Sequence, residues 1–152
     1  MEQADESRDR PEGEWTRLPS WMLTRAAEHA HRIVSDRFGS VGARGYHYRV
    51  LAALDRFGPA SQAELSRRSG IHVSEMVGTI NDLTAAGHVE RSPDPSDRRR
   101  NVISLTASGR RRLVELRTCV ERSQEELLQP LTRAERAQLI ELLTRLSDHH
   151  GP

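Results

Sequence analysis

Apolar residues recur every three or four positions along most of the chain, a spacing that places them on one face of a helix. The first such stretch begins after Pro19, and its apolar residues are Leu23, Ala26, Ala27, Ala30, Ile33, Val34 and Phe38. Glycine or proline residues interrupt the pattern, as expected where helices end. We therefore predict six helices, at residues 19–38, 46–57, 62–69, 73–86, 107–128 and 133–148.

Several of these helices also carry terminal signals. Ser61-Gln62-Ala63-Glu64 and Thr132-Arg133-Ala134-Glu135 match the capping box, in which a hydroxyl and a carboxylate satisfy backbone N–H groups of the first turn. Thr106 can cap the long helix that follows it. Gly87 stands where helix 73–86 needs a left-handed residue to end.

The apolar period changes between the fourth and fifth helices. Residues 88–91 and 101–105 have the pattern of short strands, and the loop 92–100 between them is rich in turn formers and arginine. Two short helices joined by a glycine turn and followed by a basic hairpin predict a winged helix-turn-helix, here over residues 46–106. The fold class is mainly α with a small β-hairpin wing. In this arrangement the second short helix fits the major groove of DNA.

The remaining helices favour a dimer. Helices 19–38 and 107–148 each carry an apolar stripe, and a module of the size of residues 46–106 cannot bury all of them. A second copy of the chain would cover these stripes and would also supply a second recognition helix, one DNA turn away from the first.

Composition limits the remaining possibilities. The 152 residues are 36% hydrophobic, enough for one modest core. Residues 1–15 lack apolar periodicity and are predicted to be a disordered acidic tail.

Cys119 is the single cysteine, so no internal disulfide is expected, and its place between Leu116 and Val120 predicts a buried, inert side chain. No long apolar run or leader-like start is present, so we expect a cytoplasmic protein without a membrane segment.

The charge of the chain is segregated although its net value is only +1. Residues 1–13 carry five acids and two arginines, whereas residues 91–112 carry seven arginines and two aspartates. All 23 basic residues are arginine. A local basic segment of this kind predicts contact with a polyanion such as DNA.

These motifs together are similar to those of a known family. The similar segments are residues 58–65, 83–91, 94–99, Leu105-Thr106 and Gly109. Over residues 19–147 the chain resembles the MarR family of bacterial transcription regulators, and the Asp97-Arg98-Arg99 wing followed by Leu105-Thr106 is the most specific part. The resemblance implies a homodimer, a pseudo-palindromic DNA site and, often, release from DNA by a small molecule.

The resemblance and the residue chemistry also predict DNA-binding residues. By resemblance, Asp97 braces the wing by pairing with arginine, and Arg99 is the wing-tip arginine. Arg98 and Arg100 are expected to contact phosphates or the groove. Ser61 and Gln62, at a helix N-terminus, are placed to meet a phosphate.

In the predicted recognition helix, residues 73–86, we expect Met76, Val77, Ile80 and Leu83 to face inward. The helix offers four polar positions for DNA contact: Ser74, Glu75, Thr79 and Asn81. Asparagine can pair with adenine, and glutamate can accept from the amino group of cytosine. The helix departs from the family pattern, because Gly78 and Asp82 occupy positions that are often basic. His72 stands at a helix start where Asp or Ser is usual.

A candidate effector pocket is predicted on the first helix. Trp21, Arg25 and His29 follow one another at intervals of four and so share one face, opposite the apolar stripe. They could stack on an aromatic ring, pair with an acid and supply a pH-sensitive donor. Tyr46 and His47 are expected to approach the same cleft. The alternative is a solvated face on which Trp21 simply covers the start of the helix.

Two other functions are compatible with the same sequence. The protein could be a metal- or ligand-dependent activator with the same fold, or a winged-helix adaptor that binds proteins and not DNA. We expect no enzyme, no cofactor and no metal site, because no catalytic or phosphate-binding motif is present. The histidine pairs His29/His31 and His149/His150 also lack the spacing that aligns two ligands on a helix.

Overall fold

The computed structural model describes residues 13–151 of the chain. Most of the tail predicted for residues 1–15 lies outside this range. At its edge, Glu14–Arg17 form a short 3-10 helix, and the Thr16 hydroxyl donates to the Gly13 carbonyl at 2.7 Å. Regular structure therefore begins one residue before the predicted end of the tail.

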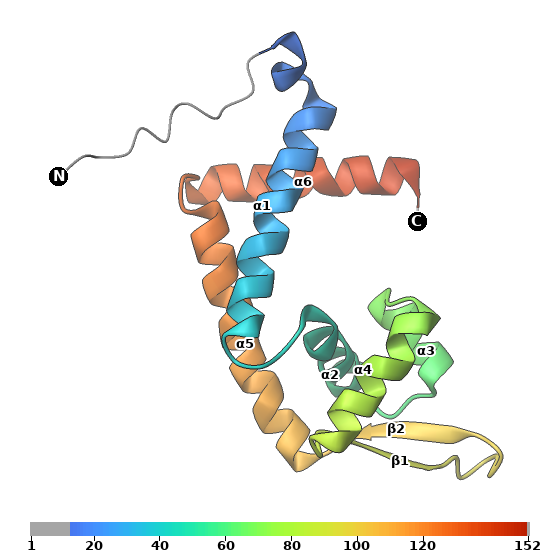
Figure 1. Cartoon of the computed structure of the whole chain (residues 1–152). Coiled ribbons are helices and arrows are strands. Elements are labelled where there is room, and N and C mark those ends of the chain that lie inside the picture. Colours follow the sequence, from blue (N-terminus) through green and yellow to red (C-terminus); the bar gives the residue numbers. More distant parts are fainter. Residues whose placement is uncertain (1–12, 152) are drawn as a thin grey trace.

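All six predicted helices and the predicted hairpin are present, which confirms the fold class (Figure 1). In chain order the elements are α1 (Pro19–Gly39), α2 (Gly45–Phe57), α3 (Gln62–Ser69), α4 (Val73–Ala85), β1 (Val89–Pro93), β2 (Asn101–Leu105), α5 (Ala107–Leu128) and α6 (Arg133–His150). None of the helices within residues 13–151 is long and apolar enough to cross a membrane.

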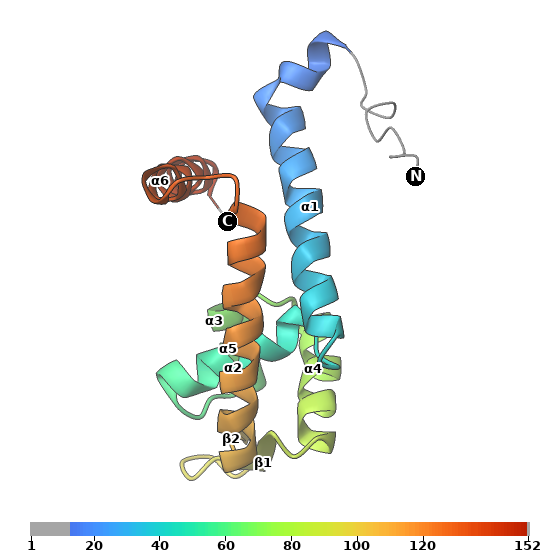
Figure 2. The ribbon, with the colours of Figure 1, turned by 90° about the vertical axis from the view of Figure 1, so that its left-hand side faces the viewer.

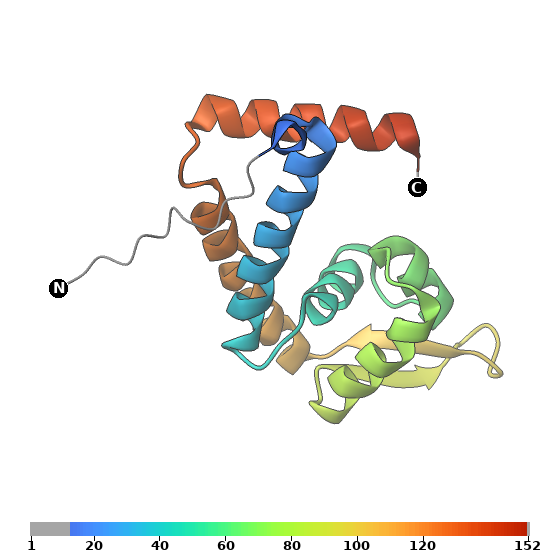
Figure 3. The same cartoon turned by 45° about the horizontal axis from the view of Figure 1, so that its top comes forward.

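Long helices occupy one end of the molecule and the winged helix-turn-helix the other. α1 packs beside α5 (Figure 2). α6 runs across the C-terminal end of α5, whereas α2, α3, α4 and the hairpin gather at the opposite end (Figure 3). No residue of α6 is buried.

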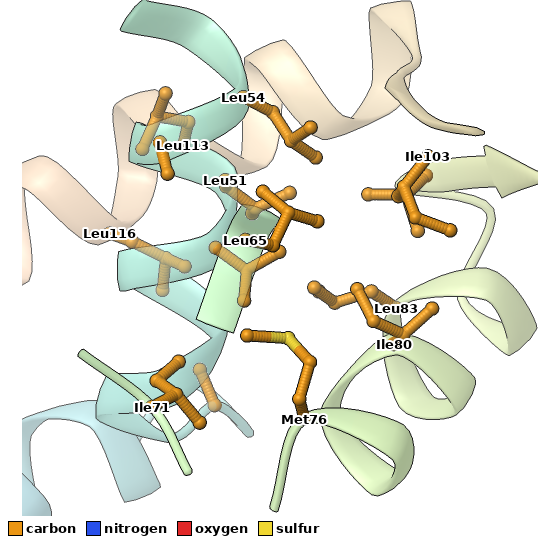
Figure 4. Close-up of a cluster of buried hydrophobic side chains, with 14 of the residues drawn as sticks. Leu51, Leu54, Leu65, Ile71, Met76, Ile80, Leu83, Ile103, Leu113 and Leu116 are labelled. Atoms are coloured by element: carbon orange, nitrogen blue, oxygen red, sulfur yellow. The ribbon is translucent and has the colours of Figure 1, made fainter. Parts of the chain in front are cut away.

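The main core lies inside the winged helix-turn-helix and includes part of α5 (Figure 4). The side chains labelled there are Leu51, Leu54, Leu65, Ile71, Met76, Ile80, Leu83, Ile103, Leu113 and Leu116. Burial of each large apolar side chain contributes about 1.5–3 kcal/mol. Because Leu113 and Leu116 belong to α5, the same core joins the long helices to the DNA-binding end of the chain.

One prediction about α4 was wrong. Val77 was expected to face inward with Met76, Ile80 and Leu83, but it is 44% exposed, and Thr79 is buried in its place. Residue 77 lies one position after Met76 and is therefore rotated by about 100° from the buried face. The spacing 76, 79, 80, 83 is the one that follows a single helix face.

The wing is fixed to the start of α3. β1 and β2 pair antiparallel, with Arg91 opposite Ile103. Ile103 also pairs with Ala60 through two backbone hydrogen bonds of 3.1 and 2.8 Å. Ala60 directly precedes Ser61, the N-cap of α3. The base of the wing and the N-terminus of α3 are thereby held together.

Candidate nucleic-acid interface

The helix-turn-helix is built around Gly70. This residue ends α3 with φ +64°, a left-handed conformation that side chains rarely adopt. α3 begins with the predicted capping box, in which the Ser61 N–H donates to Glu64 Oε2 at 2.8 Å and the Glu64 N–H donates to Ser61 Oγ at 3.3 Å. Hydrogen bonds to the Glu64 carboxylate, first from the backbone N–H of Ser61 and then from its side chain, lower the pKa of Glu64.

α4 begins with a histidine cap. His72 Nδ1 accepts from the Ser74 N–H at 3.3 Å and lies 2.8 Å from Ser74 Oγ. His72 therefore takes the capping position that Asp or Ser usually fills, and it also holds the side chain of Ser74. Ser74 and Glu75 are exposed on the first turn.

Thr79 does not belong with the exposed polar residues of α4. It is 1% exposed, and its hydroxyl donates to the Glu75 carbonyl at 2.8 Å. This contradicts its prediction as a DNA contact, because a buried hydroxyl that is already bonded to the backbone cannot reach a base. Thr79 follows Met76 by three residues and so lies on the same, buried face of α4.

Asn81 is exposed but lies apart from Ser74. Seven residues of helix separate the two positions, about 10 Å along the axis. The side-chain oxygen of Asn81 accepts from Arg91 of β1 at 2.7 Å. Arg91 was not among the predicted site residues, and its place on β1 next to the C-terminal half of α4 could not be derived from sequence spacing.

Two apolar residues on the outer face of α4 were also missed. Val73 and Val77 are 57% and 44% exposed and lie one turn apart. In the major groove, the methyl group of thymine is the apolar contact partner. The sequence carried a signal for Val77 alone, because it directly follows the buried Met76 and is rotated by about 100° from it. Val73 has the i, i+3, i+7 spacing of the buried face, so its exposure at the start of α4 could not be derived from spacing.

The wing loop is braced by two aspartates. Asp97 Oδ1 accepts from the Arg99 N–H at 3.1 Å, and its Oδ2 lies 3.9 Å from Arg100 Nε. Asp94 accepts from the N–H and the hydroxyl of Ser96 at 2.8 and 2.7 Å, and these bonds lower its pKa. The loop is therefore ordered by its own side chains.

The arginines of the wing stay at the surface. Arg98, Arg99 and Arg100 are all exposed. Residues of α3 and of the wing together line one cavity of about 820 Å³: Ser61, Gln62, Glu64 and Arg67 from α3 and its cap, and Asp94, Arg100 and Asn101 from the wing. The predicted phosphate-contact residues Ser61 and Gln62 are thus brought next to Arg100.

The predicted effector residues are not brought together. The Arg25 guanidinium lies 5.2 Å from the ring centroid of Trp21, and His29 Nδ1 accepts from Arg32 at 2.6 Å. These side chains bind neighbours on their own helix. Their segment of α1 also precedes the part that faces α2, so sharing one helix face did not place them at a common cleft with α2.

Tyr46 and His47 line two different cavities. Tyr46 lies in a cavity of about 450 Å³ between α1 and α2, and His47 lies in one of about 540 Å³ that includes Asp82, His88 and Arg112. Neither cavity includes Trp21, Arg25 or His29. Neither of these two cavities is lined by all five residues, and the shared effector pocket stays a prediction.

A cluster of charged residues joins α4 to the start of α2. The Asp82 carboxylate accepts from Arg44 and lies 3.2 Å from His47 Nε2. The hydrogen bond from His47, followed by that from Arg44, lowers the pKa of Asp82. Burial lowers the pKa of His47, although the bond to Asp82 opposes it. Asp82, which departs from the family pattern, thus serves to tie the recognition helix to α2.

Cys119 is buried, as predicted. Within residues 13–151, no three His, Cys, Asp or Glu side chains gather closely enough to hold a metal ion.

The sequence of this chain is similar to that of known DNA-binding regulators. The family model described as MarR family matches residues 43–100, from the end of the α1–α2 loop through the wing. Over these residues the chain resembles the MarR family. Among curated relatives, the HTH-type transcriptional repressor NicR of Pseudomonas putida is 35% identical over 99 residues. That match covers 65% of this chain and 63% of the relative, which is less than two thirds of its length.

Solved structures extend the likeness to most of the chain. BpsR of Bordetella bronchiseptica, whose DNA binding is regulated by 6-hydroxynicotinic acid, is 25% identical with a TM-score of 0.80, covering 91% of this chain and 99% of that one. PcaV of Streptomyces coelicolor, solved with its natural ligand, is also 25% identical and has a TM-score of 0.77. The structural match covers 93% of this chain and 100% of PcaV. The structural likeness thus includes the long helices as well as the matched residues 43–100.

Proposed function

We propose that this protein is a sequence-specific DNA-binding transcriptional regulator that acts as a homodimeric repressor and is released by a small-molecule effector. The observation that carries the proposal is the basic wing. Three exposed arginines lie on a loop braced by Asp97, beside the capped N-terminus of α3. Such a surface presents both side-chain cations and backbone N–H groups to a phosphate backbone.

Each part of the interface has its own role in the proposal. α4 enters the major groove and presents Ser74, Glu75 and Val77 to base edges. Arg99 enters the adjacent minor groove, where the negative potential is focused, and Arg98 and Arg100 contact phosphates. Ser61 and Gln62 bind a phosphate at the start of α3. Asn81, held by Arg91, contacts DNA at the other end of α4.

The exposed apolar side chains of the long helices support the homodimer. Exposed apolar residues occur on α1 and its lead-in and on α6: Leu18, Met22, Leu23, Ile140, Leu142, Leu143 and Leu146. Exposed apolar side chains gathered on helices are characteristic of subunit interfaces. We assign residues 19–38 and 107–148 to dimerisation and residues 46–106 to DNA binding.

Relatives support the repressor and effector parts of the proposal. NicR is a repressor, and the DNA binding of BpsR responds to a small aromatic acid. We extend this chemistry to the present chain as a release mechanism by an aromatic or phenolic acid. The effector stabilises a dimer whose recognition helices no longer match the two half-sites.

Selection from a randomised duplex pool tests the proposed function. The purified chain should enrich a pseudo-palindromic sequence and bind it with an affinity that falls steeply as salt rises. A winged-helix adaptor, the alternative, would enrich no sequence and bind duplex negligibly even at low salt. Loss of reporter expression from a promoter carrying the selected site would establish repression, whereas a gain would identify an activator.

A further inference from the structure

The side of α4 that faces away from the core offers few free polar groups for base recognition. Within Val73–Ala85 there is no arginine or histidine, and the chain has no lysine. The Asp82 carboxylate is engaged by Arg44. The side-chain oxygen of Asn81 accepts from Arg91 at 2.7 Å. Guanine, which is most often read by arginine or lysine, is therefore not the base that α4 is equipped to recognise.

The centre of this outer face carries only small side chains. Met76 is buried and points into the core (Figure 4). Ser74 and Gly78 lie two residues before and after it, so both are rotated by about 200° from the buried side. The Ser74 hydroxyl lies 2.8 Å from His72 Nδ1 and is thereby held at the start of the helix. At the centre of the face, the backbone of α4 can therefore come close to a partner.

Gly78 has no role inside the chain that requires a glycine. It is not among the glycines with positive φ, and a Cβ added there would meet nothing within 4 Å. A glycine in the interior of a helix is also less stable than an alanine. Since neither the backbone conformation nor the packing calls for it, the missing side chain has its effect outside the chain, where a glycine allows close approach of a partner.

Val77 is the apolar group beside this glycine. Its side chain is 44% exposed and directly precedes Gly78. Valine is short, so its methyl groups reach a base edge only where the helix backbone lies close to it. In the major groove, thymine is distinguished from the other bases by its C5 methyl group, which apolar side chains contact. An exposed valine next to a glycine therefore fits thymine.

We propose that α4 recognises one thymine in each half-site by packing Val77 against its C5 methyl group, and that Gly78 lets the helix lie close enough to the base edges for this contact. The inference rests on the proposed function, because it names the base that the recognition helix reads. Phosphate contacts from the wing and from the start of α3 position the helix, whereas the contact of Val77 specifies sequence.

Uracil interference on the selected duplex tests the contact, because deoxyuridine in place of thymidine removes only the C5 methyl group and keeps the base pair. With the full-length wild-type chain, one thymine at symmetric positions of the two half-sites should interfere. A duplex with uracil at both positions should bind about tenfold more weakly. Val77→Ala should bind the thymine duplex more weakly and should no longer distinguish it from the uracil duplex. Val41→Ala, which alters an exposed valine between α1 and α2, is the matched control and should keep the wild-type preference.

Gly78→Ala tests the close approach through two effects of opposite sign. The variant should unfold at a higher temperature, because alanine is the better helix former. It should nevertheless bind the selected duplex about fivefold or more weakly, because the added methyl group holds α4 away from the base edges. Its preference for thymine over uracil should also be smaller. Gly39→Ala, at the exposed end of α1, likewise adds a Cβ that meets nothing within 4 Å, and it should leave DNA affinity unchanged.

The outcomes separate this inference from the proposed function. If the chain selects a duplex but uracil at none of its thymine positions weakens binding, the inference fails and the proposed DNA-binding function stands. The inference is also overturned if Val77→Ala keeps the wild-type preference for thymine, or if Gly78→Ala binds the duplex as tightly as the wild type. If the chain selects no duplex, the proposed function and the inference fail together.

Discussion

Arg99 is the residue at which the wing can be tested alone. Its backbone N–H is held by Asp97, and its side chain is exposed. Arg99→Ala should weaken binding to the selected duplex by about 1–3 kcal/mol if the side chain enters a narrow minor groove. It should also flatten the plot of log affinity against log salt by about one unit if it neutralises a phosphate. Arg122→Ala, on α5 away from the wing, should change neither value. A folded Arg99→Ala protein with wild-type affinity and slope would contradict the assignment.

Two histidines near α4 make the stability of the fold depend on pH. Burial lowers the pKa of both His47 and His88 below the ordinary value of 6.5, and the charge of Arg112 lowers that of His88 further. The unfolded chain therefore binds protons more readily than the folded chain below pH 6.5. The free energy of unfolding should fall as the pH falls through this range, by at most about 1.4 kcal/mol per pH unit for each histidine.

Urea titrations between pH 7.5 and 5.5 measure this dependence. The double variant His47→Gln with His88→Gln should show a flatter pH profile than the wild type, because its two polar replacements do not titrate. The control variant His149→Gln with His150→Gln alters exposed residues at the end of α6 and should keep the wild-type slope. Equal slopes in all three proteins would show that other groups set the pH dependence.

At the scale of single elements, two glycines in helices should respond to alanine in opposite ways. A Cβ at Gly109, in the first turn of α5, would lie 2.0 Å from the His88 carbonyl oxygen. Gly109→Ala should therefore lower the free energy of unfolding by about 1–3 kcal/mol, because the joint between the wing and α5 must open. At Gly78 of α4 the added Cβ meets nothing within 4 Å. Gly78→Ala should raise stability by up to about 1 kcal/mol. Thermal unfolding of both variants provides the comparison, and a stable Gly109→Ala protein would refute the close contact.

The elements were largely predictable from sequence because their signals are local. Periodicity and the Ser61 and Thr132 capping boxes depend on residues within a few positions of one another, so the helix bounds agree with the structure to within a few residues. The wing followed from turn formers and arginines in one short segment. The inward and outward faces of α4 were harder to predict, because successive residues of a helix differ in direction by about 100°. For this reason Val77 and Thr79 were each assigned to the wrong face.

The parts of the site that could not be predicted join distant segments. The contacts Arg44–Asp82, Arg49–Ser69 and Arg91–Asn81 link residues of different elements, and no spacing rule specifies them. Whether the five predicted effector residues share one pocket also depends on packing between distant segments. Trp21 and Arg25 were correctly placed on one helix face, but only packing decides which turns of α1 lie against α2.

At the scale of the whole molecule, one core connects the proposed dimerisation helices to the proposed DNA-binding region. Leu113 and Leu116 of α5 pack into the core of the winged helix-turn-helix, while Arg110 and Arg117 of α5 pair with Asp55 of α2 at 3.2 and 2.8 Å. A shift of α5 at the proposed dimer interface would therefore move α2 as well.

The proposed dimer interface is tested by removing α6. A chain that ends at Pro130 should be monomeric in sedimentation at micromolar concentration, because the exposed apolar side chains Ile140, Leu143 and Leu146 are lost with α6. Since no residue of α6 is buried within the single chain, the truncated protein should keep the helix content of the remaining elements. It should bind the selected palindrome far more weakly than the full chain, because the two half-sites are no longer bound by one linked pair of recognition helices. Deletion of residues 2–13 is the control, and it should leave both the dimer and the DNA affinity nearly unchanged. A dimeric protein after truncation at Pro130 would show that α1 and α5 associate without α6.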